Sequence, residues 1–251
     1  MNIIELNILA PAFIAGLLVL ATHILFGMKI LERGVIFADL AVAQIAGLGV
    51  VMAGLLELNV HPVLVRCIAA ASALCGAGLL AWIEHRLPEV KEACIGLTFV
   101  LAASGSILLM SRDVHSGEHL KDLLVGQILW VTADQLIAVS MLTAVLLALW
   151  QWSKLKMSTL GFYGLFALAV TASVQLIGVY LVFASLIVPA LATHHLRQSR
   201  TRYAFAVGIA GYAIGLLLST WLDLPAGAAI VWAMAMIGGI AMLLLKPRKI
   251  A

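Results

Sequence analysis

The chain has 251 residues, of which 64% are hydrophobic and only 11% are charged. A soluble domain has about 45–50% apolar and about 25% charged residues. The composition therefore excludes an ordinary soluble globule, a disordered chain and a coiled coil. The apolar residues suffice for about eight spans of about 20 residues each. We expect an all-α fold, a polytopic transmembrane helical bundle, with residues 1–251 forming one transmembrane domain.

The apolar runs follow one another with short polar breaks between them. The first run has no basic region before it and is too long for a signal peptide, so we expect it to remain a spanning helix. The run 160–192 is too long for one upright span, and Gly178 and Pro189 are its candidate breaks. We count seven to nine membrane segments, with eight as the central expectation. The predicted runs are 8–28, 34–56, 62–83, 93–111, 136–150, 160–192, 203–221 and 226–245, with 123–131 as a further apolar stretch.

Lys and Arg lie in the short breaks between the runs, and the net charge is +3. They do not gather on a soluble face, so we expect no nucleic-acid partner. The breaks 57–61 and 223–225 contain neither Lys nor Arg. The positive-inside rule places these two breaks outside and the basic ones in the cytoplasm. For Lys156 and Arg197 both to be cytoplasmic, the run between them must cross twice or re-enter.

No known catalytic motif occurs in the sequence. There is no GxxxxGK[ST] loop to cradle phosphates, no GxSxG or HExxH, and no long soluble insert. We therefore predict that the chain is not an enzyme and holds no cofactor. Any ATP that drives it is hydrolysed on another chain.

Ionisable groups inside apolar runs are functional candidates, because each costs about 2.5–3.5 kcal/mol at the centre of a span. Asp39, near the start of the second run, is either an interfacial carboxylate or, as we favour, a metal or pathway ligand. Gln44 lies about 140° further round the helix, so the two share no face, and interhelical hydrogen bonding is its more common role. His23, inside the first run, is equally compatible with a hydrogen-bonded core histidine and with a metal ligand or proton relay.

A short polar segment follows the fourth run and contains His115, Glu118, His119 and Asp122. On a helix, these spacings would bring imidazole and carboxylate groups to one face, where they could bind a divalent cation. The alternative is a solvated loop of mixed charge, which is the more common case for such a segment. We rank the candidate metal contacts as Asp39, His23 and His119, followed by Gln44 and Asp122.

Several segments resemble the membrane permease subunits of metal-ion ABC transporters, which import zinc, manganese or iron into bacteria. GVYLVFASLIVPALAT (178–193) is similar to the family's apolar stretch that ends in Pro and small residues. STWLDLPAGAAIV (219–231) resembles its late helix–turn–helix, and HLKDLLVGQILWVTADQL resembles a middle segment. In the N-terminal half, a break with Arg33 precedes a helix that opens with Phe-x-Asp. The likeness covers nearly the whole chain.

The resemblance implies a multi-pass protein of the bacterial inner membrane and a homodimer. It also implies a cytoplasmic ABC ATPase subunit and an extracytoplasmic metal-binding protein as partners. The loop after the Pro-containing helix, 194–202, corresponds to the segment that docks on the ATPase in related importers. Its candidate coupling residues are His195, Arg197, Arg200 and Arg202.

The sequence departs from the family at the expected metal site. The family pattern has an Asp with a His one turn later; Asp39 matches the Asp, but the His position holds Ala43, or Gln44 if one residue is inserted. His23 and the segment 115–122 are then alternative sources of ligands. A self-sufficient cation carrier or channel is the alternative function, distinguished by whether an ATPase co-purifies. A membrane-embedded enzyme is a third and weaker hypothesis.

Overall fold

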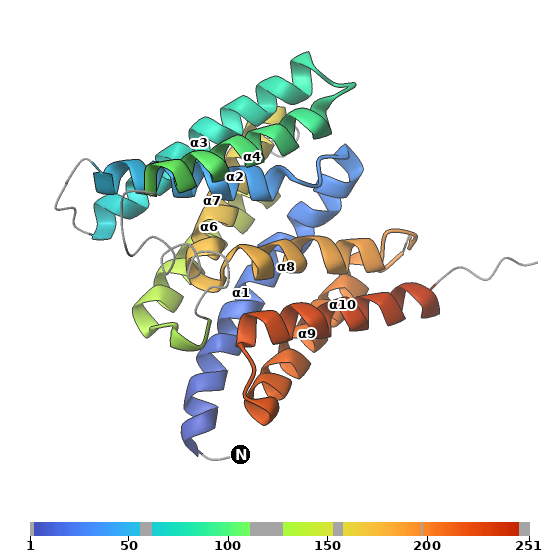
Figure 1. Cartoon of the computed structure of the whole chain (residues 1–251). Helices are drawn as coiled ribbons and strands as arrows, with labels where there is room; N and C mark the ends of the chain where they lie inside the picture. Colours follow the sequence, from blue (N-terminus) through green and yellow to red (C-terminus); the bar gives the residue numbers. More distant parts are fainter. Residues whose placement is uncertain (1–2, 56–61, 111–127, 153–157, 197, 246–251) are drawn as a thin grey trace, which may run out of the picture. The chain divides into compact units, whose positions relative to one another are not determined.

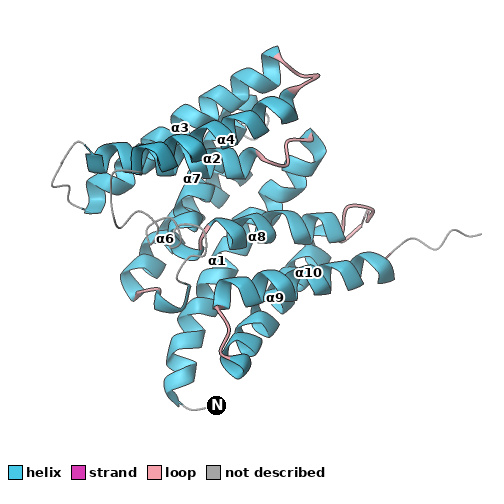
Figure 2. Cartoon of the chain, in the orientation of Figure 1, coloured by secondary structure: helices cyan, strands magenta, loops and turns pink. Residues whose placement is uncertain are grey.

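The computed structural model describes residues 3–55, 62–110, 128–152, 158–196 and 198–245, and all regular elements in these ranges are helical (Figure 2). The predicted all-α fold is therefore confirmed. The elements are α1 (Ile3–Arg33), α2 (Ala38–Leu55), α3 (Pro62–Arg86), α4 (Lys91–Met110), the 3-10 helix η1 (Ile128–Trp130), α6 (Ala133–Trp152), α7 (Thr159–Ile177), α8 (Val179–Ala192), α9 (Arg200–Leu222) and α10 (Ala226–Leu244).

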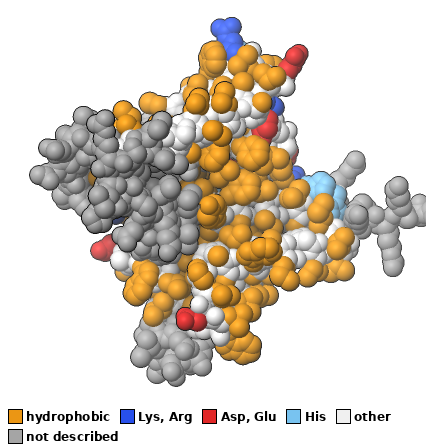
Figure 3. All heavy atoms as spheres, viewed as in Figure 1, with side chains coloured by type: hydrophobic (Ala, Val, Ile, Leu, Met, Phe, Trp, Pro, Cys, Tyr) orange, Lys and Arg blue, Asp and Glu red, His pale blue; other side chains and the backbone are white. Residues whose placement is uncertain are grey.

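Six of the described helices are long and apolar enough to cross a membrane, namely α1, α3, α6, α7, α9 and α10. Two shorter apolar helices, Ala38–Ala53 within α2 and Val179–Ala192, accompany them. Together they agree with the expectation of about eight membrane segments. Hydrophobic side chains cover much of the described surface in view, as expected for a membrane protein (Figure 3). Large apolar side chains such as Trp152, Trp221 and Leu244 are more than three-quarters exposed. In a bilayer such side chains face lipid rather than water.

The long apolar run near the C-terminal half divides into two helices, α7 and α8. The break lies at Gly178, whose φ of 80° is a conformation that residues with a Cβ rarely adopt. Pro189 does not break the run, because it lies inside α8 and the helix continues to Ala192. Two helices are what the charge pattern requires if Lys156 and Arg197 lie on the same side. The side itself stays a prediction.

The chain forms two compact units, which we describe separately. The first unit contains residues 1–33, 123–144 and 175–251. In it, α1 packs against α8 and α9, and α10 packs against the same two helices (Figure 1). Two glycines allow these close approaches, because a Cβ on Gly27 would overlap the Leu186 carbonyl of α8 and a Cβ on Gly215 would overlap the Ile230 backbone of α10.

The second unit contains residues 34–122 and 145–174. Here α2 packs against both α3 and α4. Gly49 of α2 lies directly against Ser72 of α3, which a Cβ would displace. At the start of α7, Phe162 stacks on Phe166 with ring centroids 5.8 Å apart. The assignment of residues 1–251 to a single permease domain stays a prediction.

Candidate functional site

Among the described carboxylates of the second unit, Asp39 is the most deeply buried. It lies in the first turn of α2, and only 1% of its surface is exposed. The partial positive charge of a helix N-terminus favours an anion at this position. Nevertheless its Oδ1 is buried and has no hydrogen-bond partner. A buried polar atom without a partner loses its hydration and gains nothing in return, so it is available to a ligand.

The positions that follow Asp39 carry no imidazole. Ala43, one turn later on the same face, is buried, and Gln44 is only half-buried. The described part of the chain holds no group of three or more His, Cys, Asp or Glu side chains that could bind a metal ion. A cation that reaches Asp39 would therefore have to complete its coordination with backbone oxygens, water or single additional side chains.

His23 is fully buried in α1, in the first unit. Its Nδ1 lies 3.0 Å from the Val19 carbonyl oxygen and 3.1 Å from Thr22 Oγ1. Because a carbonyl oxygen only accepts, Nδ1 carries the proton and donates it to Val19. In the neutral ring Nε2 then has a free lone pair, and this atom is buried without a partner. Metal-binding histidines are oriented in this way, with one ring nitrogen held by a carbonyl.

The face of α1 that carries His23 is turned toward α8 and α9. Gly16, Leu20 and Gly27 share this face with it at spacings of three and four residues. A Cβ on Gly16 would meet the ring of Tyr212 in α9, and Leu20 lies against Gly208 in the same helix. Gly27 lies against α8. The free Nε2 therefore lies within the packed interior of the first unit rather than on its lipid-facing surface.

A second buried polar group in the first unit is fully hydrogen-bonded. Ser185 Oγ donates to the Leu181 carbonyl at 2.7 Å, which uses its only proton. The Tyr212 hydroxyl, 2.9 Å away, must then donate to Ser185 Oγ. This pair joins α8 to α9 and is best explained as a structural contact.

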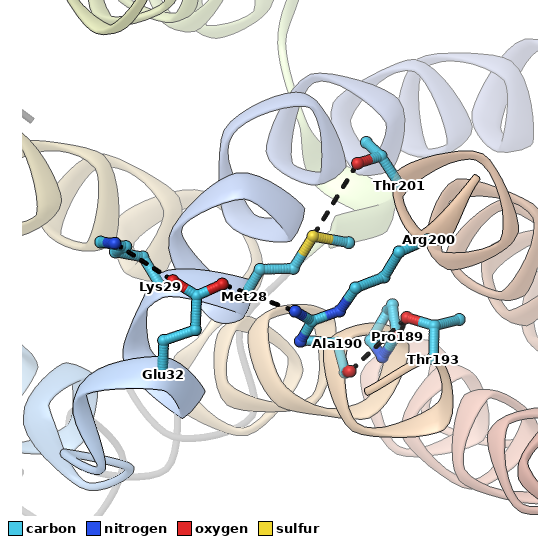
Figure 4. Close-up of polar contacts among 8 residues, drawn as sticks. All are labelled: Met28, Lys29, Glu32, Pro189, Ala190, Thr193, Arg200 and Thr201. Atoms are coloured by element: carbon cyan, nitrogen blue, oxygen red, sulfur yellow. Dashed lines mark hydrogen bonds and ion pairs between the residues drawn. The ribbon is translucent and has the colours of Figure 1, made fainter. Parts of the chain in front are cut away.

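The predicted coupling loop is anchored to α1 at one end. Arg200, in the first turn of α9, has an Nη1 atom 3.6 Å from Glu32 Oε1, and Lys29 Nζ lies 3.1 Å from Glu32 Oε2 (Figure 4). Thr201 lies beside Met28, with 3.9 Å between Oγ1 and Sδ. At the other end of the loop, the hydroxyl of the buried Thr193 donates to the Pro189 carbonyl at 2.8 Å. The loop is thus bonded to the elements on either side of it.

Within the loop, the predicted residues differ in exposure. His195 Nε2 donates to the Leu245 carbonyl at 2.8 Å, so this ring holds the end of α10. Arg202 is exposed, and so is His194, whose ring lies edge-on to that of His195. Ser199 adopts a left-handed conformation with φ of 58° immediately before α9. Docking on an ATPase stays a prediction for all of them.

Three of the predicted site residues, His119, Asp122 and Arg197, lie outside the described residues, as do His115 and Glu118. Sequence reasoning did not single out Glu92, which lies in the first turn of α4 and accepts a hydrogen bond from the Phe37 amide at 3.1 Å. It also missed Glu32 as the partner of Arg200. Both glutamates lie in charged breaks, where their partners cannot be read from spacing.

Comparison with known proteins identifies a family. The profile of a family described as the ABC 3 transport family matches residues 5–244. This confirms the predicted resemblance to the permeases of metal-ion ABC transporters. A Haemophilus influenzae protein described as a probable iron transport system membrane protein is 27% identical over 164 residues, which are 56% of this chain. The match spans 60% of that relative's length.

A solved structure shares the fold. PsaBC from Streptococcus pneumoniae, determined in complex with a Fab, superposes with a TM-score of 0.69 at 22% sequence identity. The match covers 94% of this chain and 89% of that one. The fold is therefore one that a solved structure also adopts.

Proposed function

Because the chain belongs to the ABC 3 transport family, we propose that it is the membrane permease of an ATP-driven importer for a divalent metal ion. It performs no covalent chemistry itself. A separate cytoplasmic ATPase supplies the energy, an extracytoplasmic protein delivers the metal, and two copies of the chain form the conduit in the inner membrane. The name of the Haemophilus relative supports iron as one cargo, beside manganese and zinc.

The observation that carries this proposal is the buried carboxylate of Asp39. An anion in the first turn of an apolar helix, with an oxygen that no protein group satisfies, suits a cation in transit. Conduction requires groups that replace part of the ion's hydration shell and yet let it go. A single carboxylate, assisted by water and backbone oxygens, provides such a weak site.

His23 is the second group we assign to the path. Its Nδ1–H is held by the Val19 carbonyl, so its free Nε2 is a preformed donor for a borderline metal such as Fe²⁺ or Zn²⁺. Each of the two groups acts within its own compact unit, as a separate contact for the passing ion.

The loop 194–202 is the part we assign to the ATPase. Its exposed groups, His194 and Arg202, are available to a partner, whereas Arg200 is bonded to Glu32. A movement imposed on the loop would reach α9 directly. Through the Arg200–Glu32 ion pair it would also reach the end of α1.

The proposal is tested by metal uptake in cells that carry Asp39→Ala. Asp134, an exposed carboxylate in the first turn of α6, provides the matched control Asp134→Ala. We expect Asp39→Ala to abolish uptake at normal expression, and Asp134→Ala to leave uptake unchanged. Unchanged uptake with Asp39→Ala would remove Asp39 from the path.

The dependence on a partner is tested separately. The chain alone, reconstituted in vesicles, should not concentrate metal ions, and uptake should appear only with the ATPase and nucleotide. Accumulation without either would contradict the proposal and favour a self-sufficient carrier.

A further inference from the structure

Two carboxylates from different helices come together in the second unit. Asp39 lies in the first turn of α2 and Glu92 in the first turn of α4, and these helices pack against each other. Glu92 Oε1 accepts the amide hydrogen of Phe37, two residues before Asp39, at 3.1 Å. This bond holds Glu92 against the start of α2. Because Asp39 lies in the first turn of that helix, the bond brings the Glu92 carboxylate near Asp39.

Each of the two groups has an oxygen that nothing satisfies. Only 1% of the surface of Asp39 is exposed, and its Oδ1 has no hydrogen-bond partner. Glu92 Oε2 is likewise buried and without a partner. The partial positive charge at the N-terminus of each helix stabilises the carboxylate in its own first turn. These partial charges do not remove the repulsion between two neighbouring anions in surroundings of low polarity, which is larger than in water. A bound cation would remove this repulsion and satisfy both oxygens.

We propose that Glu92 is a second ligand of the Asp39 site, so that one divalent cation is held between the two carboxylates. This inference rests on the proposed function and deepens it. No His lies one turn after Asp39, where Ala43 stands. The ligands that the two side chains contribute are therefore carboxylate oxygens, and water and backbone carbonyls would complete the coordination. Such a site favours oxygen-preferring ions such as Mn²⁺ over ions that prefer nitrogen or sulfur ligands.

A purely structural role for Glu92 would require less of its side chain than a ligand role does. To hold the start of α2, Glu92 needs only Oε1 as an acceptor for the Phe37 amide, and no charge. Glu92→Gln keeps a carbonyl oxygen for that amide and removes the negative charge. Glu92→Ala removes both. The two substitutions therefore separate the ligand role from the structural one.

Glu89 is the matched control. It is also a glutamate, lies three residues earlier in the turn between α3 and α4, and is exposed. Glu89→Gln removes the same charge from the same part of the chain without touching the buried pair.

The test measures Mn²⁺ binding to the purified full-length chain in detergent, by titration calorimetry or by the electron paramagnetic resonance of free Mn²⁺. We expect Glu92→Gln to weaken Mn²⁺ binding by about 10–100-fold, the range found for residues that support metal sites. Its melting temperature without metal should be unchanged or higher. Glu89→Gln should bind within about twofold of the unchanged chain, well below a tenfold or 1.4 kcal/mol effect.

Three outcomes would overturn the inference: equal Mn²⁺ binding by Glu92→Gln and Glu89→Gln, a loss of binding in Glu92→Ala alone, or no Mn²⁺ binding by the unchanged chain. Metal uptake in cells distinguishes these outcomes from failure of the proposed function. If the unchanged chain supports uptake and Asp39→Ala abolishes it, the importer stands and only the role of Glu92 is rejected. If the unchanged chain supports no uptake, the proposed function itself fails.

Discussion

Two pairs of buried polar side chains, one in each compact unit, differ in how their hydrogen-bonding groups are satisfied. In the first unit, the Tyr212 and Ser185 hydroxyls form a chain that ends on the Leu181 carbonyl, so the bonding capacity of their protons is used. In the second unit, Asp39 and Glu92 each keep a buried oxygen without a partner. A satisfied buried group stabilises the fold, whereas an unsatisfied one weakens it unless a ligand arrives. The contrast underlies our proposal that Asp39 and Glu92 bind the cargo, whereas Tyr212 and Ser185 form a structural pair.

Asp39→Asn provides the largest expected effect. The amide keeps the size of the side chain but removes the charge that attracts a cation. We expect uptake to fall to the background of cells without the chain, while the melting temperature is unchanged or raised because a buried anion has been removed. Uptake of radioactive or fluorescently reported metal and thermal unfolding in detergent measure the two effects. A lower melting temperature with normal uptake would reverse our assignment of Asp39.

His23→Leu tests a buried group of the first unit whose ring atom Nε2 has no hydrogen-bond partner. Leu fills a similar apolar volume and lacks Nε2, so we expect uptake to fall by about tenfold, the lower end of the range for groups at metal sites. Thr22→Val is the control, since it removes only the hydroxyl beside the ring. If both variants transport equally well, His23 belongs with the structural groups.

Gly215→Ala tests the packing on which the first unit depends. Its new Cβ would overlap the Ile230 backbone, which cannot move as a flexible side chain could. We expect a loss of about 1–3 kcal/mol in stability, as for other overpacked interiors, seen as a lower melting temperature. Gly239→Ala is the control, because nothing lies within 4 Å of the added Cβ. Equal stability of the two variants would mean that α9 and α10 do not approach so closely.

Tyr212→Phe removes the hydroxyl from the satisfied pair. We expect a loss of about 1 kcal/mol, the usual contribution of one hydrogen bond, with metal uptake preserved. The Ser185 hydroxyl still donates to Leu181, so no buried proton is left without an acceptor. Loss of uptake at normal stability and expression would show that the pair serves transport and would break the contrast between the units.

Glu32→Gln is expected to have the smallest effect on stability. Glu32 is 52% exposed at its side chain, so its pairs with Lys29 and Arg200 contribute roughly 0–1 kcal/mol. If the Arg200–Glu32 pair transmits movement from the loop, ATP-driven uptake should fall by more than this stability change explains. Added salt should weaken uptake by the unchanged chain more than uptake by Glu32→Gln, which has no ion pair left for salt to screen.

Much of the fold follows from local properties of the chain. The spacing of apolar runs predicts helices because a bilayer requires about 20 apolar residues per span and a fully hydrogen-bonded backbone. The break at Gly178 is also predictable from a local property, because only Gly readily adopts the positive φ of this position. Pro189 shows the limit of local rules, because a helix held on several sides by neighbouring helices continues through it.

The sequence by itself determined the class of the molecule and singled out Asp39 and His23, because composition and a charge within an apolar run are properties of single segments. Only the tertiary structure decided which polar groups have partners. The bond from Phe37 to Glu92 joins positions 55 residues apart. The ion pair of Arg200 with Glu32 joins the start of α9 to the end of α1. Partners of this kind depend on how helices pack in three dimensions, and spacing along the chain does not encode that packing.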